Sequence, residues 1–201
     1  ASEDKQAALE KARAELEAAG SIFSSTSDTE VLVHLVARSK EIAFEDQVVD
    51  ALSRVQGAYS LLFLCDDTII AVRDPRGIRP LCLGILPSRK DAHVIASEPI
   101  SFDLIGAEYV RDVEPGEMLV IDASGIKSVR LPDPETPKQC VFEYVYFARP
   151  DSALNGRSVY EVRKELGRTL ARESGIDADV VIPVPDSGVP SAIGFAGERQ
   201  L

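Results

Sequence analysis

The sequence lacks three features, each of which would define a class of protein. It has no excess of basic residues: 22 Lys and Arg stand against 33 Asp and Glu, a formal net charge of −11 at pH 7, which argues against binding to nucleic-acid phosphates. No apolar run approaches the ~18 residues that a membrane-spanning helix needs. The first residues are charged and rich in alanine, without the apolar core of a signal peptide. We therefore expect a cytoplasmic protein that binds neither nucleic acid nor a membrane.

Cysteine and histidine are also scarce. The cysteines Cys65, Cys82 and Cys140 are widely spaced, and two of them sit inside apolar runs, which favours buried free thiols in a reducing compartment over a disulfide. His34 and His93 have no ligand cluster around them in the sequence, so we interpret both as structural. The remaining composition, 45% hydrophobic and 27% charged, is that of an ordinary globular protein.

The N-terminal part of the chain has the pattern of helices. Residues 3–19 hold strong helix formers and precede Gly20, a suitable C-terminal cap. Ser27 and Glu30 have the spacing of a capping box, in which each side chain accepts a bond from the other residue's backbone N–H. A further helix is predicted at residues 44–55. The apolar side of the helix that follows the capping box consists of Val31, Leu32, Leu35 and Val36.

From Ala58 onward the periodicity is that of strands. Short apolar segments separated by turn residues predict an antiparallel meander, with a hairpin at residues 116–130. Residues 131–138 contain three prolines and predict a linker. After the linker, FEYVYF (residues 142–147) and VVIPVP (residues 180–185) each predict a strand that ends in a polar loop.

A helix is predicted between these two strands. Ser158 and Glu161 form a second capping-box pattern, and Gly175 marks the end of the helix. The apolar positions at helical spacing are Val159, Val162, Leu166 and Leu170. The fold class is therefore α+β: helices and an antiparallel sheet, followed by the opening of a βαβ unit.

Asp28 is the first candidate binding residue. In the first turn of a helix, a carboxylate complements the helix dipole without any further role. Its segment SSTSDTEV, with GAYSLLFL, RDPRGIRPL and ASEPISFDLIGA, resembles the glutaminase sandwich of amidotransferases with an N-terminal nucleophile. The resemblance implies that Asp28 holds the α-amino group of substrate glutamine, and an ammonium in a closed pocket does need a carboxylate partner. We interpret residues 73–81 as a structural turn.

The second candidate site is the loop Pro185, Asp186, Ser187 and Gly188. These residues suit a turn that leads to Pro190 at a helix start, and they equally suit an anion site at that helix N-terminus. Together with FEYVYFARPDS, this stretch resembles the second domain of glutamine phosphoribosylpyrophosphate amidotransferases. The resemblance implies that the loop cradles pyrophosphate with backbone N–H groups, in a type I phosphoribosyltransferase domain. It also implies a glutaminase domain at 1–134 and part of the phosphoribosyltransferase domain at 135–201.

The resemblance extends to cofactors. The family uses Mg²⁺ with phosphoribosylpyrophosphate, through an acidic pair that we expect beyond residue 201. Cys140 matches a position where some members bind a [4Fe–4S] cluster and others keep a cysteine without a cluster. The other three ligands would also lie beyond residue 201, so Cys140 is either a free thiol or an iron–sulfur ligand.

The family's reaction opens de novo purine synthesis. Ammonia released from glutamine displaces pyrophosphate from phosphoribosylpyrophosphate and gives 5-phosphoribosylamine; family members are homo-oligomers that respond to purine nucleotides. The nucleophile is a first-position cysteine, whereas this chain begins Ala1-Ser2, so we assign no catalytic residue and expect the 201-residue chain alone to be inactive.

Two alternatives stay open. One is another amidotransferase of the same superfamily, such as glucosamine-phosphate synthase, against which FEYVYFARPDS and PVPDSG count. The other is a non-catalytic remnant that serves as a binding module.

Overall fold

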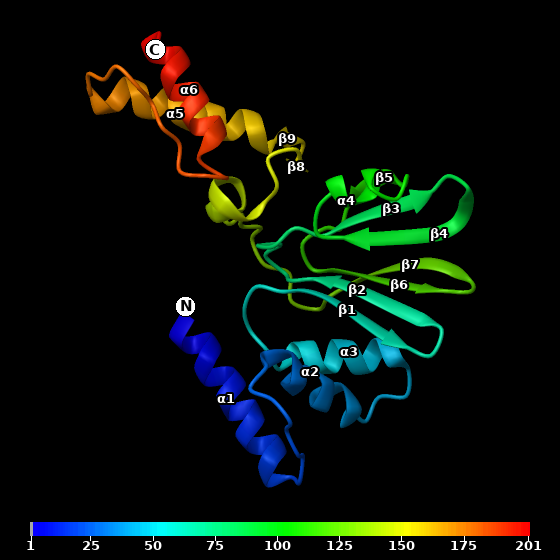
Figure 1. The fold of residues 1–201 in the computed structure, drawn as a ribbon. Helices are drawn as coiled ribbons and strands as arrows, with labels where there is room; N and C mark the ends of the chain where they lie inside the picture. Colours follow the sequence, from blue (N-terminus) through cyan, green and yellow to red (C-terminus); the bar gives the residue numbers. More distant parts are fainter. Residues whose placement is uncertain (1) are drawn as a thin grey trace.

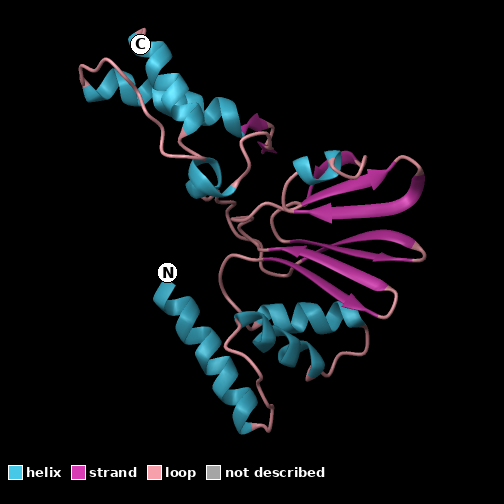
Figure 2. Ribbon diagram, in the orientation of Figure 1, coloured by secondary structure: helices cyan, strands magenta, loops and turns pink. Residues whose placement is uncertain are grey.

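The structure, a computed structural model, describes residues 2–201, with the side chains of all but residues 2–6, 90 and 91 (Figure 1). A helical layer comes first in the chain, then two stacked β-sheets, then a helical C-terminal segment (Figure 2). The α+β class is confirmed. In the part of the chain that the structure describes, no helix has the length and apolar character to cross a membrane.

The three N-terminal helices form where the sequence predicts them. They are α1 (Ser2–Ala18), α2 (Asp28–Ala37) and α3 (Phe44–Ser53). Helix α1 is followed by Gly20 at φ +89°, a conformation that an L side chain rarely adopts. Helix α2 buries Val31, Leu32 and Leu35, three of the four positions on its predicted apolar side, whereas Val36 is partly buried.

The strands divide into two antiparallel sheets rather than one meander. Their bounds are β1 (Ser60–Cys65), β2 (Thr68–Arg73), β3 (Cys82–Leu86), β4 (Arg89–Ala96), β5 (Glu108–Asp112), β6 (Glu117–Asp122) and β7 (Gly125–Arg130). One sheet has the order β1-β2-β6-β7, and the other has the order β4-β3-β5. The hairpin β6–β7 was predicted, whereas β5 and the short helix α4 (Ile100–Asp103) were not.

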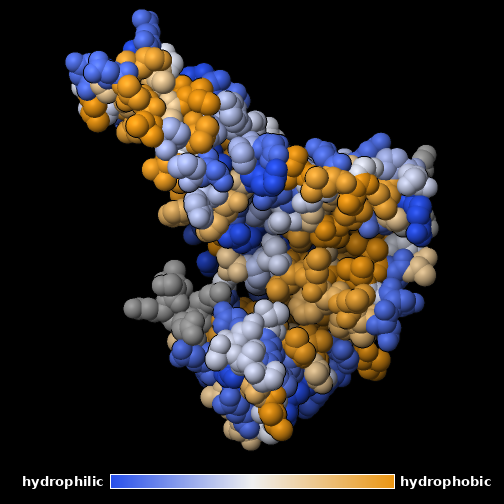
Figure 3. All heavy atoms as spheres, viewed as in Figure 1, coloured by the Kyte–Doolittle hydropathy of each residue, from blue (hydrophilic) through white to orange (hydrophobic). Residues whose placement is uncertain are grey.

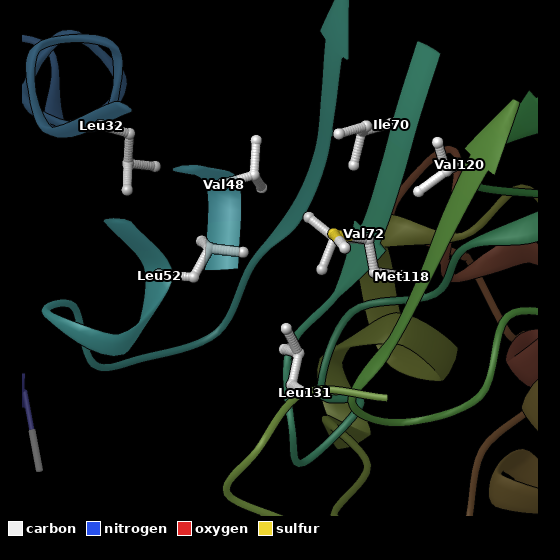
Figure 4. Close-up of a cluster of buried hydrophobic side chains, with 8 residues drawn as sticks. All are labelled: Leu32, Val48, Leu52, Ile70, Val72, Met118, Val120 and Leu131. Atoms are coloured by element: carbon white, nitrogen blue, oxygen red, sulfur yellow. The ribbon is translucent and has the colours of Figure 1, made fainter. Parts of the chain in front are cut away.

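The core lies on both faces of the central strands β2 and β6. Ile70 and Val72 of β2, with Met118 of β6, pack against α2 and α3 (Figure 4). On the opposite face Ala71 and Leu119 pack against the second sheet. The alternation follows from the period of two along a strand, and it places the α2–α3 layer, the first sheet and the second sheet in that order.

Two predicted strands are wrong. FEYVYF forms the π-helix η1 (Glu143–Phe147), which closes its own backbone bonds: the Ala148 N–H donates to the carbonyl of Glu143 at 3.0 Å. VVIPVP belongs to no helix or sheet, since Pro183 and Pro185 lack the N–H groups that a ladder needs. Ile182 remains 83% exposed, and Figure 3 shows apolar surface over this C-terminal region. Apolar alternation predicts a strand only where a partner strand is available.

The C-terminal segment is built on two closely packed helices, α5 (Val159–Ser174) and α6 (Val189–Arg199), preceded by the two-residue strands β8 (Ala153–Leu154) and β9 (Arg157–Ser158). Ser158 caps α5 by accepting from the Glu161 N–H, and Gly175 ends it with φ +60°, both as predicted. The predicted apolar positions do not all form the buried side, because Leu166 and Leu170 are exposed. The buried positions of α5 are Val159, Arg163, Gly167 and Ala171.

Small residues explain which side of α5 is buried. A Cβ at Gly167 would lie 1.9 Å from the Ser191 carbonyl oxygen, and one at Gly194 would lie 2.0 Å from that of Lys164. The backbones of the two helices therefore approach closely only because neither position carries a side chain.

Candidate functional site

The serine-rich turn before α2 is held by Glu30. Its Oε1 accepts from the Ser24 N–H at 2.7 Å, and its Oε2 accepts from the Ser25 N–H at 2.8 Å. Both serine hydroxyls also donate to this carboxylate. The backbone bond from Ser24, followed by the Ser25 hydroxyl, lowers the pKa of Glu30 to about 2. The turn that leads to Asp28 is thus organised around a permanent negative charge.

The predicted capping box is only half correct. Ser27 is the N-cap, and its hydroxyl accepts from the Thr29 N–H. The Glu30 carboxylate binds Ser24 and Ser25 instead of returning to Ser27, whose own N–H contacts the Ser25 hydroxyl. The spacing of Ser27 and Glu30 correctly predicted the start of α2. It did not predict the partners of Glu30, because Ser24 and Ser25 together offer two N–H groups to its carboxylate.

Asp28 borders a cavity of about 220 Å³ between α1, α2 and β1. This volume is below the roughly 300–1,000 Å³ of pockets for drug-sized ligands and suits a small metabolite. Asp28 itself is exposed at the first position of α2. No cysteine is among the lining residues. The lining is Leu9, Asp28, Thr29, Leu32, Val55, Gln56, Ala58, Tyr59, Ser60 and Leu61.

Residues 73–81 form a hydrogen-bonded loop with a structural role. The buried Arg73 guanidinium donates to the carbonyls of Arg79, Val113 and Gly77 at 2.8, 2.7 and 2.9 Å. Asp74 is fully buried and accepts from the backbone N–H groups of Arg76 and Ile78. Gly77 has φ +64° and lies against Pro115, where a Cβ would meet the proline ring at 2.7 Å.

A second cavity of about 500 Å³ opens beside this loop, between α3 and residues 131–135. Tyr59 and the ion-paired side chains of Arg76 and Glu135 are among its lining residues. Burial raises the pKa of Tyr59, and the carboxylates of Asp74 and Glu135 raise it further. No residue that the sequence singled out as a site lies in this cavity.

The loop Pro185, Asp186, Ser187 and Gly188 is a compact turn ahead of α6. The Gly188 N–H donates to the carbonyl of Val184 at 3.1 Å, and the Val189 N–H donates to that of Asp186 at 3.3 Å. A Cβ at Gly188 would lie 2.5 Å from the Val184 oxygen, so the turn requires glycine there. Pro190 occupies the first turn of α6 as predicted.

The structure does not bring the two candidate sites together. Asp28 begins α2, the 185–188 loop begins α6, and Figure 1 places these helices at opposite ends of the molecule. Among the described residues, no group of three or more His, Cys, Asp and Glu could hold a metal ion. Within this described part Cys140 therefore has no set of partner ligands for an iron–sulfur cluster, no acidic group stands ready for Mg²⁺, and we derive no step through either.

Sequence reasoning missed the residues that join the sandwich to the C-terminal segment. Arg79 Nε lies 2.7 Å from Glu143 Oε1, and Glu98 accepts from the Arg149 N–H at 2.9 Å. One signal in the sequence could have pointed to them. Arg79 lies in RDPRGIRPL and Glu98 lies in ASEPISFDLIGA, two motifs to which we assigned no chemistry.

The comparisons with known proteins cover both parts of the chain. A family model for a glutamine amidotransferase domain matches residues 8–103. The chloroplastic amidophosphoribosyltransferase of Glycine max is 53% identical over 182 residues, which are 90% of this chain and 32% of that protein. The amidophosphoribosyltransferase of Bacillus subtilis is 48% identical over 90% of this chain and 38% of its own length. The chain thus spans about a third of the curated relatives it matches.

Solved structures give the same result. The glutamine phosphoribosylpyrophosphate amidotransferase of B. subtilis, in complex with ADP and GMP, superposes with a TM-score of 0.89 and 46% identity, over 95% of this chain and 41% of that one. A structure of the allosteric regulatory enzyme of purine biosynthesis also superposes with a TM-score of 0.89 and 46% identity, over 94% of this chain and 40% of that one.

Proposed function

We infer, since this chain belongs to the amidophosphoribosyltransferase family, that the full protein carrying it makes 5-phosphoribosylamine from glutamine, phosphoribosylpyrophosphate and water. Glutamate and pyrophosphate are the other products, and the reaction is the first step of de novo purine synthesis. The whole reaction is a proposal for this chain, because the chain spans only 32% to 38% of the relatives quoted above.

The observation that carries the proposal is the extent of the similarity. A superposition at 46% identity over 95% of the chain extends over both the sandwich and the C-terminal segment. Another amidotransferase, such as a glucosamine-phosphate synthase, would share the sandwich and then diverge, since its partner domain is a sugar-phosphate isomerase. The extent of the similarity therefore favours transfer of the ammonia to phosphoribosylpyrophosphate over transfer to a sugar phosphate.

We assign Asp28 the role of holding the α-amino group of glutamine. Three features of the site support this role: an exposed carboxylate, a neighbouring cavity of amino-acid size, and a turn before it that Glu30 holds in place. A charge-assisted bond between an ammonium and a carboxylate is both strong and directional. Asp28 would orient glutamine without taking part in the covalent chemistry.

We assign the 185–188 loop the role of binding pyrophosphate. The loop precedes α6, whose N-terminal end carries the positive end of the helix dipole and favours an anion, and Gly188 permits the compact turn that leads into the helix. We further propose domains at 1–134 and 135–201, a homo-oligomeric full protein, and a cytoplasmic location that keeps the thiols reduced. The family implies Mg²⁺ for the phosphoribosyl step and leaves a [4Fe–4S] cluster at Cys140 open.

The full-length protein carrying Asp28→Asn tests the glutamine site. We expect its KM for glutamine to rise roughly 10-fold or more, since a hydrogen bond to a charged group contributes about 1.5–3 kcal/mol. Pyrophosphate release with an ammonium salt as nitrogen donor should stay unchanged, because that reaction bypasses glutamine. The measurement is the rate of pyrophosphate release against the concentration of each donor.

Asp67→Asn is the matched control, since Asp67 is an exposed aspartate in the turn between β1 and β2. An equal loss of both reactions in Asp28→Asn would indicate that Asp28 only supports the helix. A wild-type protein that releases pyrophosphate with neither donor would overturn the proposed function.

A further inference from the structure

Three contacts join the sandwich to the π-helix η1 and to Arg149. The Arg79 side chain pairs with Glu143, and its guanidinium lies 4.6 Å from the centre of the Phe147 ring. Glu98 accepts from the backbone N–H of Arg149. We call these five residues, Arg79, Glu98, Glu143, Phe147 and Arg149, the η1 clasp.

The sandwich side of the clasp is rigidly supported. The carbonyl of Arg79 accepts from the buried Arg73 guanidinium, which also holds Gly77 and Val113. Glu98 lies in the short turn between β4 and α4. Both side chains therefore project from short connections that adjoin the strands of the sandwich.

On the C-terminal side, hydrogen bonds connect the clasp to α6. Arg163 of α5 donates to the carbonyls of Tyr144 and Ala148, at the two ends of η1. The carbonyl of Arg163 accepts from the Ser191 hydroxyl at 3.0 Å, and Ser191 lies three residues after the 185–188 loop. Consecutive hydrogen bonds thus lead from Glu98, through residues 148 and 149 and Arg163, to the first turn of α6.

We propose that the η1 clasp is the positioning device that sets the 185–188 loop relative to the sandwich, so that nitrogen released at one site is used at the other. Arg79 and Glu98 are then positioning residues for the coupled reaction, not catalytic ones. The inference rests on the proposed function. It adds named residues, outside both candidate sites, on which the coupling of the two half-reactions depends.

The burial of Glu143 fits a positioning role for the clasp. The Glu143 side chain is 7% exposed. Burial raises the pKa of Glu143, the Arg79 cation opposes that effect, and the charge of Glu98 adds to it. Without Arg79, Glu143 would be a buried carboxyl with no cation beside it, which would weaken the attachment of η1 to the sandwich.

Full-length variants separate coupling from the half-reactions. The variants are Arg79→Ala, Glu98→Ala and Glu98→Gln, whose amide oxygen can still accept from the Arg149 N–H. Three quantities are measured: glutamate release from glutamine, pyrophosphate release with an ammonium salt, and the pyrophosphate formed per glutamate when glutamine is the donor. Arg54→Ala is the matched control, because Arg54 has the same 44% side-chain exposure as Arg79 and forms an ion pair with Glu15, away from the clasp.

We expect Arg79→Ala and Glu98→Ala to lower the pyrophosphate formed per glutamate by roughly 2- to 30-fold, the range of coupling effects of residues between two sites. Both half-reactions should persist, and Glu98→Gln should restore coupling while Arg54→Ala leaves it intact. Unchanged coupling in both alanine variants would overturn the clasp and leave the proposed function standing. A parallel loss of both half-reactions would also overturn it, since that result indicates a general structural role. A wild-type protein without either pyrophosphate reaction would instead overturn the proposed function, and the clasp with it.

Discussion

Single charged residues hold the loops of this chain in place. Arg73 and Arg163 are both buried and each donates to backbone carbonyls, so their charges are solvated by peptide groups rather than by carboxylates. Glu117 at the start of β6 is the acidic counterpart: it accepts two bonds from Arg111, one from the Ser128 hydroxyl and one from the Glu114 N–H. Buried charges are tolerated where each polar atom has such a partner.

Glu117→Gln should destabilise the chain in a pH-dependent way. Burial alone would raise the pKa of Glu117, but the bonds from Arg111 and Ser128 outweigh it and lower the pKa from 4.5 to about 2. The stabilisation is therefore complete above pH 4.5 and is lost as the pH falls toward 2. We expect the variant to lose about 1–3 kcal/mol of unfolding free energy at pH 7, and the difference from wild type to shrink below pH 4.5. Urea titrations at several pH values measure both.

Glu108→Gln serves as the control, because Glu108 is exposed on β5. A difference between Glu117→Gln and wild type that is the same at pH 3.5 and pH 7 would contradict the assigned role of the carboxylate charge.

Local sequence patterns predicted the role of a residue only where its hydrogen-bond partner is near in the sequence. Ser27 and Ser158 were placed correctly because a cap depends on the next few residues. The pair of Glu98 and Arg149 lies 51 residues apart, and nothing in either segment indicates the other. Asp28 was found only through its motif, and its role stays a prediction.

At the level of elements, helices were predicted better than strands. A helix closes its backbone bonds within its own sequence, whereas a strand needs a partner that the sequence does not name. FEYVYF and VVIPVP have strand composition, yet the first forms η1 and the second joins no sheet. The hairpin β6–β7 was predictable because its partner follows directly at the turn. Strand β5 pairs with β3, more than twenty residues earlier, and was missed.

The close crossing of α5 and α6 should be the most sensitive point of the C-terminal segment. In Gly167→Ala the new Cβ would lie 1.9 Å from the Ser191 carbonyl oxygen, which is backbone and cannot rotate away. The helices must separate, and we expect a loss of about 1–3 kcal/mol in unfolding free energy, as for an overpacked core. Thermal and urea unfolding, followed by circular dichroism, measure the loss.

Gly197→Ala provides the contrast within α6. A Cβ at Gly197 meets nothing within 4 Å, so alanine should stabilise the helix by up to ~1 kcal/mol through its higher propensity. Equal effects of the two substitutions would mean that the crossing is not tightly packed.

At the level of the whole molecule, residues 131–138 join two parts with few mutual contacts. Leu131 is buried, and the rest of this stretch is exposed. Arg76 holds it twice: its carbonyl accepts from the Lys138 N–H at 2.8 Å, and its guanidinium pairs with Glu135. The stretch is therefore exposed to a protease but fixed at its end.

Arg76→Ala should make the bond after Lys138 more sensitive to trypsin. Loss of the pair with Glu135 frees the stretch to adopt the extended conformation that a protease binds, and we expect cleavage there to accelerate about 2- to 5-fold, as for the loss of a surface ion pair of up to ~1 kcal/mol. Mass spectrometry of timed digests measures the rate at this bond. Arg54→Ala controls for the loss of a surface ion pair elsewhere, and an equal acceleration in both variants would count against the assigned role of Arg76.

The two-sided burial of β2 constrains how the chain can vary in length. Ile70 and Val72 face the helices, while Ala71 and Arg73 face the second sheet. One inserted or deleted residue would exchange these faces. The guanidinium of Arg73 would then point into the apolar layer between the sheet and the helices. We therefore expect an inserted or deleted residue to be tolerated in a turn, such as residues 123–124 between β6 and β7, and not within β2. The central strands thus set a fixed length around which the loops alone can grow or shrink.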